Sequence, residues 1–395
     1  MKALKRWSWV ALFLLVSLAL SSCTHLGMNQ YRAEVDGTLP GLKEPVTVVR
    51  DEKGMAYIYA KSTEDALLAY GFTAAQDRLF QMELIRFFAT GRISEMIGEK
   101  GEAIDRRMRT IGFHRHARRQ AAILEPGTKN LWQKYLDGIN AFIQNHPGEY
   151  PLEFKLAGIK PKPWDIADSM AVLYLMSWDS AANIETEIIA QMLVEKVGGE
   201  KAREIFPLNI NPDDEVKGKA FIQTPVTETV HLNFAADKNL QAFLQDRPLQ
   251  LGSNNWVTGP RLSLGGKPIV SNDPHLDART LPGPWYPCGL ITPEFRWIGA
   301  GIPGTSSMIV GRNEHIAVGV TNAYGDAQDL YVETIDPKNP DRYLEGDQSL
   351  PLEVITEKLS IKDKNAPGGI REKEIKIRLT RRGPVVSGVL SGLKT

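Results

Sequence analysis

The sequence has little cysteine, few histidines and no excess of either charge. Only 2 of its 395 residues are cysteines, so the chain could form at most one internal disulfide. Lys plus Arg and Asp plus Glu both number 47, and this balance gives no electrostatic footprint for a nucleic-acid partner. The 34 glycines and 24 prolines are too few for a low-complexity chain, and the length suits a globular protein of two or three lobes.

Common catalytic motifs are also missing. The sequence has no G-x-S-x-G elbow, no H-E-x-x-H zinc motif, no P-loop and no G-x-G-x-x-G turn opening a helix. Of the 7 histidines, only His114 and His116 lie close together. On a helix, residues two apart point in different directions, so these two are predicted to be surface residues rather than metal ligands.

The N-terminus has the pattern of an export signal. Met1–Arg6 carries three positive charges, and Trp7–Leu20 is a nearly unbroken apolar run that is too short to span a bilayer. Small residues then precede Cys23, as in the bacterial lipobox, where the chain is cut before a lipid-modified cysteine. Residues 1–22 are therefore predicted to be a signal peptide, and a periplasmic or envelope lipoprotein held to the membrane through Cys23 is expected. An ordinary signal peptide with a chance cysteine is the alternative.

The second cysteine is not expected to be catalytic. If Cys23 carries a lipid, Cys288 has no partner for a disulfide within the chain. No group in Trp285–Gly289 would lower the pKa of its thiol. Stability is therefore expected to come from packing.

The first half of the sequence has mainly helical patterns. Short β segments within residues 41–60 are followed by capping residues near Ser62 and a helical apolar spacing that ends near Gly91. A second helical block starts near Pro163, with Asp168 as its predicted cap, and continues to the Gly198-Gly199 stop.

The second half has mainly β patterns. Residues 266–270, 307–310 and 316–320 read as strands, the last two forming a hairpin. Apolar and charged residues alternate over 352–362 and 374–381, which is typical of half-exposed antiparallel strands.

Several separated segments together resemble one enzyme family. They are Tyr70–Phe72 leading into Ala75–Glu83, Gly91–Arg92, Gly252–Val257, Ser271–Leu276 and Gly319–Asp326. In this order they resemble the penicillin acylase family of N-terminal nucleophile hydrolases, from about residue 40 to the end. Agreement at separated places is specific, whereas any one tetrapeptide would be weak.

The resemblance implies an α+β fold, the αββα sandwich of N-terminal nucleophile hydrolases in partial form, with a mainly helical α-chain region. The chain would then divide into a signal peptide (1–22), an α-chain region (23–222), a polar spacer (223–252) and the first, mainly β part of a β-chain (253–395). The β-chain of the family is longer, so the sequence is expected to be truncated at its C-terminus and to lack a downstream asparagine that donates to the oxyanion.

The family's chemistry assigns the nucleophile to Ser253. The precursor would cut itself between Gly252 and Ser253, giving an α/β heterodimer, and the new α-amine, with an ordinary pKa of roughly 7.7 to 8.0, would serve as the base for the serine hydroxyl. The resemblance also implies that the backbone N–H of Asn322 is an oxyanion donor and that His275 orients Ser253. A Ser253-His275-Asp273 triad is discounted, because the last two are expected to point the same way only in part.

The resemblance further implies a structural calcium ion between the two chains. Asp326, Gln328 through its backbone carbonyl, and Asp329 are hard oxygen ligands of the kind that calcium takes, and Glu187 is the preferred ligand from the α-chain. Two weaker α-chain options are Asn183 and Glu185. A solvated acidic turn is the alternative interpretation.

Three functional hypotheses follow. The first is an amidohydrolase precursor acting on a small-molecule carboxamide, such as a β-lactam side chain, an acyl homoserine lactone or a similar N-acyl compound. The second is a truncated, non-catalytic envelope lipoprotein of the same fold. The third, placed last because no base lies nearby in sequence, makes Ser306 or Ser307 a conventional serine nucleophile.

Overall fold

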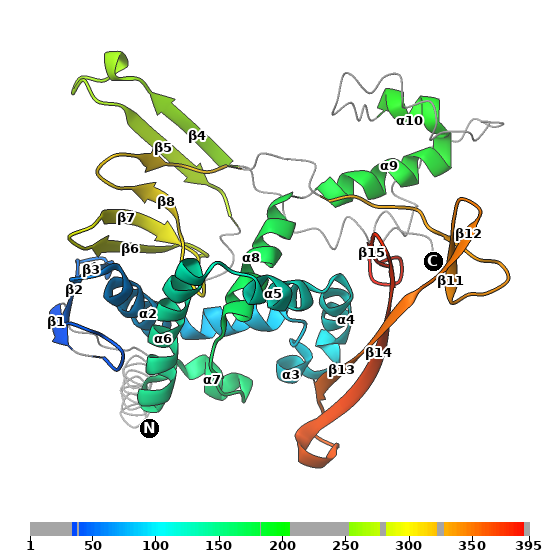
Figure 1. The fold of residues 1–395 in the computed structure, drawn as a ribbon, viewed down its shortest axis with the longest axis horizontal. Coiled ribbons are helices and arrows are strands. Elements are labelled where there is room, and N and C mark those ends of the chain that lie inside the picture. The colour runs from blue at the N-terminus through cyan, green and yellow to red at the C-terminus, as the bar shows by residue number, and fades with distance from the viewer. Residues whose placement is uncertain are drawn as a thin grey trace, which may run out of the picture.

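The computed structural model describes residues 34–37, 39–181, 183–205, 253–276, 282–321 and 328–390 (Figure 1). The helices are α2 (Thr63–Ala89), α3 (Ser94–Ile97), α4 (Glu102–Ile111), α5 (Phe113–Ala122), α6 (Pro126–Asn145), α7 (Leu152–Ala157), α8 (Ile166–Ala181), α9 (Asn183–Val197) and α10 (Gly199–Ile205). The strands are β1 (Glu34–Gly37), β2 (Val46–Arg50), β3 (Ala56–Tyr59), β4 (Ser253–Thr258), β5 (Ile269–Pro274), β6 (Tyr286–Ile291), β7 (Arg296–Gly301), β8 (Met308–Arg312), β9 (Ala317–Val318), β10 (Thr334–Ile335), β11 (Arg342–Glu345), β12 (Gln348–Pro351), β13 (Glu353–Lys362), β14 (Ile370–Thr380) and β15 (Gly383–Pro384). This content confirms the α+β class.

The largest sheet combines strands from both halves of the chain. Its seven strands have the order β1-β2-β3-β6-β7-β8-β9, and neighbours are antiparallel except for the parallel pair β3 and β6, which places Ala56 beside Cys288. Three smaller sheets contain β4-β5, β10-β11-β12 and β13-β14-β15. A second sheet of comparable size is not found within the described ranges.

Helix α2 forms the layer against this sheet. It begins at Ser62, whose hydroxyl accepts the N–H of Asp65 at 3.2 Å, as the sequence predicts for a cap. Most of its length is buried, and its apolar side chains share one core with Ile58 of β3 and with Tyr286 and Cys288 of β6. Burial raises the pKa of the Cys288 thiol to about 12, which fits the expectation that it is not a nucleophile.

Helices α2 and α6 cross at two glycines. A Cβ atom on Gly71 would lie 1.8 Å from the carbonyl oxygen of Tyr135, and one on Gly138 would lie 1.9 Å from that of Leu68. These distances are far below any real Cβ contact, so no larger residue fits at either position without moving a helix. The two helix backbones are therefore in direct contact at these glycines.

A buried arginine ties the end of α2 to the start of α8. Arg86 is 2% exposed and binds Glu83 at 2.6 Å and Asp168 at 2.9 Å, and its guanidinium lies 4.7 Å from the ring centre of Trp164. Asp165 accepts the N–H of Asp168 at 2.9 Å, and Asp168 accepts the N–H of Asp165 at 3.2 Å. The cap of α8 is thus Asp165. The prediction of Asp168 as the cap was wrong, because that residue sits three positions later in a reciprocal capping box.

The long ribbon of β13 and β14 docks on the helical region through Glu357. This carboxylate binds Arg115 at 2.6 Å, Arg109 at 3.1 Å and the Nε2 atom of His114 at 3.2 Å. His114 is only 6% exposed, and burial lowers its pKa, although the neighbouring Glu357 acts in the opposite direction. The prediction that both neighbouring histidines lie at the surface was wrong for His114 and holds for His116, since the helix turns the two side chains to opposite environments.

The predicted signal peptide, Cys23 and the spacer 223–252 lie outside the described residues. Within the described part of the chain, no helix is both long and apolar enough to cross a bilayer. The predicted alternating strands of residues 352–362 and 374–381 are confirmed as β13 and β14, whose apolar face contains Leu359, Ile361, Ile375 and Ile377.

The helix crossing leads to a stability prediction. A Gly138→Ala substitution places a methyl group against the backbone of α2, so we expect the free energy of unfolding to fall by about 1 to 3 kcal/mol or more. Urea denaturation of the two proteins measures the change. Gly148→Ala is the control, because a Cβ atom there meets nothing within 4 Å. Equal effects of the two substitutions would contradict the close crossing.

The docking of the ribbon leads to a pH prediction. Burial alone would raise the pKa of Glu357, but hydrogen bonds from His114 and Arg115 and the charge of Arg109 lower it from 4.5 to about 2. A depressed pKa means that the carboxylate stabilises the fold above pH 4.5 and that this contribution is lost as the pH falls from 4.5 to about 2.

We therefore expect Glu357→Gln to reduce stability at pH 7 by an amount on the order of 3 kcal/mol. The difference from the wild-type protein should shrink as the pH falls below 4.5. Denaturant titrations at a series of pH values test this. The control is Glu353→Gln, at an exposed position of the same strand. A constant difference across the pH series would refute the assignment.

Candidate active site

The hairpin of β4 and β5 places Ser253 beside the segment that follows β5. The two strands are antiparallel, with Ser253 opposite Pro274 and Asn254 opposite Asp273. Ser253 is the first residue of β4 and is half-buried. The strands β4 and β5 lie side by side (Figure 1), and their register brings together the two separate motifs around Ser253 and around His275.

Two hydrogen bonds hold Ser253. The backbone N–H of His275 donates to the serine Oγ at 3.3 Å, and the hydroxyl of Thr321 donates to the serine carbonyl oxygen at 3.1 Å. Because Oγ acts as the acceptor in the first bond, its own hydrogen remains available to a base. The arrangement fixes the backbone of Ser253 and the direction of one lone pair.

The side chains of Asp273 and His275 lie on one face of the chain. Nε2 of His275 is 2.8 Å from Oδ2 of Asp273, with the two side chains 39% and 68% exposed. The expectation that they would align only in part was wrong, because alternate residues of an extended strand point to the same side. The ring is hydrogen-bonded to Asp273, whereas the contact with Ser253 comes from the backbone of His275, so an orienting role of the imidazole itself stays a prediction.

A residue without an assigned role in the sequence joins the hairpin to the segment after β9. The side-chain amide of Asn272 donates to the carbonyl of Val320 at 2.7 Å, and its Oδ1 accepts the N–H of Val320 at 3.0 Å. Asn272 belongs to the quoted Ser271–Leu276 motif, but the sequence assigned it no role. Gly252, Asn322 and Asp326, three of the predicted site residues, lie outside the described residues.

The predicted calcium ligands are brought together in part. The Oε2 atom of Glu187 on α9 accepts the N–H of Leu330 at 2.6 Å, and the side-chain amide of Asn183 donates to the carbonyl of Gln328. Asp329, which lies between Gln328 and Leu330 in the sequence, is exposed. The donors are hard oxygens of the type calcium takes, but the described residues contain no group of three or more His, Cys, Asp or Glu side chains placed to hold a metal ion.

The helical motif near residue 80 holds the loop before β6. Arg78 donates to the carbonyl of Gly283 at 2.9 Å, and Gln81 donates to that of Pro282 at 2.7 Å. Asp77 binds Arg50 at 2.9 Å and accepts the hydroxyl of Tyr286 at 2.7 Å. These contacts explain why a polar sequence stands in an otherwise buried helix.

The alternative nucleophiles lie in a different environment. Ser306 and Ser307 follow a turn in which the hydroxyl of Tyr135 accepts the N–H of Gly304 at 3.1 Å. None of the hydrogen bonds found among the described residues joins either serine hydroxyl to a histidine or a carboxylate. The structure therefore gives these serines no base.

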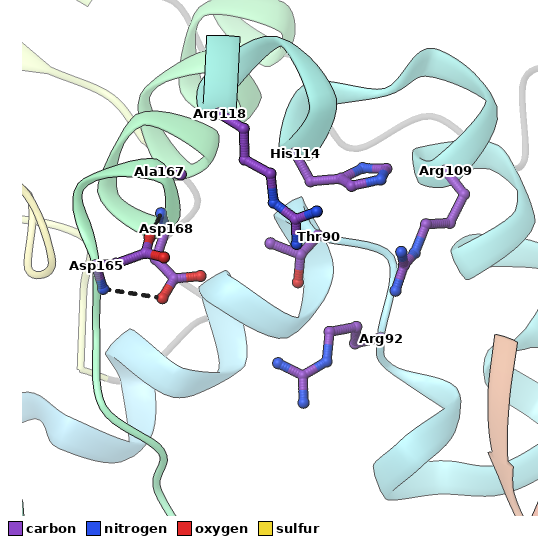
Figure 2. A pocket seen from close by; sticks show the side chains of 8 residues that line it. All are labelled: Thr90, Arg92, Arg109, His114, Arg118, Asp165, Ala167 and Asp168. Carbon is purple, nitrogen blue, oxygen red and sulfur yellow. Dashed lines mark hydrogen bonds between the residues drawn. The ribbon is translucent and has the colours of Figure 1, made fainter. Parts of the chain in front are cut away.

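A polar cavity of about 90 Å³ lies elsewhere, between the ends of α2, α4, α5 and α8 (Figure 2). It is lined by Thr90, Arg92, Arg109, His114, Arg118, Asp165, Ala167 and Asp168. Arg92 is bound to Glu95 at 2.6 Å, and the lining aspartates are used in the cap of α8. Most of the charged groups that line this cavity are already paired, and none of its lining residues comes from β4 or β5. The cavity is therefore a polar contact region between helices and is separate from Ser253.

The fold is that of an α+β protein with Ser253 at the start of β4, and comparison with known proteins specifies the family. The sequence profile of the penicillin amidase family matches residues 45–394. The chain therefore belongs to the penicillin amidase family.

Named relatives agree with this assignment. Acyl-homoserine lactone acylase QuiP of Pseudomonas aeruginosa is 28% identical over 398 residues, which cover 95% of this chain and 45% of that protein. Penicillin acylase 2 proenzyme of Pseudomonas sp. is 30% identical over 361 residues (89% and 45%), and penicillin G acylase of Escherichia coli is 26% identical over 384 residues (83% and 45%). A solved thermostable penicillin G acylase from Alcaligenes faecalis gives a TM-score of 0.36 at 25% identity, covering 50% of this chain and 100% of that one. The chain spans about half the length of these curated relatives.

Proposed function

We propose that this chain carries the nucleophile of an acylase that hydrolyses a carboxamide through an acyl ester on Ser253. The observation that carries the proposal is the position of Ser253 at the start of β4, where His275 and Thr321 hold its Oγ and its carbonyl. The names of the relatives, acyl-homoserine lactone acylase and penicillin acylase, support an N-acyl substrate of small size.

The chemistry begins with cleavage between Gly252 and Ser253. The new α-amine has an ordinary pKa of roughly 7.7 to 8.0 and takes the hydroxyl proton as Oγ adds to the substrate carbonyl carbon. The same amine returns the proton to the leaving nitrogen, and water then hydrolyses the ester by the reverse sequence. The N–H of Asn322, one residue after Thr321, is the proposed donor to the oxyanion.

In this proposal the two cleavage products remain together as an α/β heterodimer. Strand β3, from the first product, is paired with β6, from the second, inside one sheet. Glu357 of the second product is bound to two arginines of the first. The name of one relative, a proenzyme, supports such processing.

We further propose that calcium binds between α9 and the segment 328–330. Glu187, the carbonyl of Gln328 and Asp329, together with Asp326, are the residues that would hold it, and its contribution would be to join the two products. At a calcium concentration about 100 times the dissociation constant, the folded protein should gain about 2.7 kcal/mol.

A thermal-shift titration tests the calcium proposal. Calcium should raise the unfolding temperature of the wild-type protein and should have little effect on Asp329→Asn. The control Asp347→Asn, an exposed aspartate in the turn between β11 and β12, should respond like the wild type. If chelator and calcium leave the wild-type unfolding temperature unchanged, the site does not exist.

The decisive test of the function is the mass of the chain expressed with its leader in a bacterial host. We expect two fragments, the second beginning at Ser253, and we expect Ser253→Ala to give a single uncut chain without amidase activity. The matched control Ser306→Ala should be cut normally. The mass of the first fragment also shows whether Cys23 carries lipid. Cleavage of the Ser253→Ala variant at the same bond would contradict the proposal.

The competing function is a non-catalytic envelope lipoprotein of the same fold. It predicts an uncut chain whose Ser253 does not react with serine-directed reagents. Labelling of Ser253 by a fluorophosphonate counts against it, and turnover of penicillin or an acyl homoserine lactone in a substrate panel excludes it.

A further inference from the structure

The side chain of Asn272 behaves as an additional rung of a β-ladder. Its carboxamide exchanges two hydrogen bonds with the single peptide residue Val320, one of 2.7 Å as donor and one of 3.0 Å as acceptor. The same amide nitrogen also lies 3.3 Å from the carbonyl of Asn254. A carboxamide has the donor and acceptor of a peptide group, so this side chain pairs with backbone as a neighbouring strand would.

The backbone near Val320 is shaped to accept this contact. A Cβ atom on Gly319 would lie 2.9 Å from Cβ of Asn272 and 3.2 Å from the amide nitrogen of Asn255. Only glycine leaves room for the segment to lie so close to the hairpin. Residue 319 therefore lies directly against the side chains of Asn272 and Asn255.

The contact reaches the nucleophile through the next residue. Thr321 follows Val320, and its hydroxyl donates to the carbonyl of Ser253 at 3.1 Å. Ser253 lies on β4, and Asn272 lies on β5, the strand paired with it. Asn272 thus closes a ring of contacts that runs from Val320 through Thr321 to Ser253 and back across the hairpin.

We propose that Asn272 is a positioning residue for the nucleophile Ser253, acting by fixing residues 319–321 against the hairpin. The inference rests on the proposed function of Ser253. Asn272 reaches the reacting serine through Val320 and Thr321, through its bond to the carbonyl of Asn254 and through the strand pairing, so it contributes geometry and no proton. A displacement of about 1 Å in such a support can cost a reaction about 100-fold.

The molecule contains an internal control for this type of contact. Asn140 on α6 makes the same pair of bonds with Trp164, donating to its carbonyl at 2.9 Å and accepting its N–H at 2.8 Å. That clamp joins two parts of the helical region away from the hairpin. If both asparagines merely stabilise the fold, substitution of either should have the same kind of effect.

The experiment compares Asn272→Asp with Asn140→Asp in the full chain. Aspartate keeps the shape and the acceptor oxygen but places an anionic oxygen against backbone carbonyls. Asn140→Asp therefore loses one hydrogen bond, and Asn272→Asp loses two, those to Val320 and Asn254. Three quantities are measured well below the unfolding temperature: the rate of cleavage before Ser253, the rate of Ser253 labelling by a fluorophosphonate, and hydrogen exchange in a peptide covering residues 314–321.

We expect Asn272→Asp to slow cleavage and labelling by about 10- to 100-fold and to speed exchange in the 314–321 peptide. Asn140→Asp should lower the unfolding temperature while its folded molecules cleave and label at the wild-type rate. If Asn272→Asp cleaves and labels like the wild type, the positioning role is wrong although the proposed function stands.

The positioning role is also wrong if both variants slow cleavage and labelling in proportion to their loss of stability. If the wild-type chain neither cleaves nor labels, the proposed function fails first and the positioning role falls with it. The exchange measurement then shows only whether the clamp exists in solution.

Discussion

The close crossing of α2 and α6 is the constraint on which most of the described structure depends. Because the backbones meet at Gly71 and Gly138, the side chains next to the crossing have fixed positions relative to the two helices. Tyr70 of α2 stacks on Tyr286 of β6 with ring centres 6.0 Å apart, and Tyr135 of α6 accepts the N–H of Gly304. One helix pair thereby locates the central strand of the large sheet and the turn that leads into β8.

Charged groups in this protein join separate elements of the fold. Arg86 connects the end of α2 to α8, and Glu357 connects the β13-β14 ribbon to α4 and α5. Both groups are largely buried and both have several partners, which is the condition under which a buried charge is tolerated. The two hydrogen bonds at Ser253 that involve a side chain, by contrast, are neutral ones, from the N–H of His275 and the hydroxyl of Thr321.

Local signals in the sequence predicted local structure well. Ser62 marked the start of α2, and alternation of apolar and charged residues marked β13 and β14, because caps and alternation depend only on neighbours in the chain. The predictions failed where a distant segment decides the environment. His114 is buried because Glu357 lies over it, and no pattern within α5 contains that information.

The candidate site shows the same division. The family resemblance predicted that Ser253 and His275 belong to one site, and the antiparallel register of β4 and β5 agrees with that prediction. The role of Asn272 could not be read in advance, since its partner Val320 is far along the chain and the contact is to backbone, which leaves no trace in residue types.

The parallel pairing of β3 with β6 has a consequence for the order of events during folding. The paired residues Ala56 and Cys288 are roughly 230 positions apart, so this rung forms only after a very long loop has closed. While the chain is continuous, the two strands share a high effective concentration. In a chain already cut at the proposed site before Ser253, the same encounter would be a collision between separate molecules. If the proposed cleavage takes place, a cut delayed until the sheet has formed would let the continuous chain assist assembly.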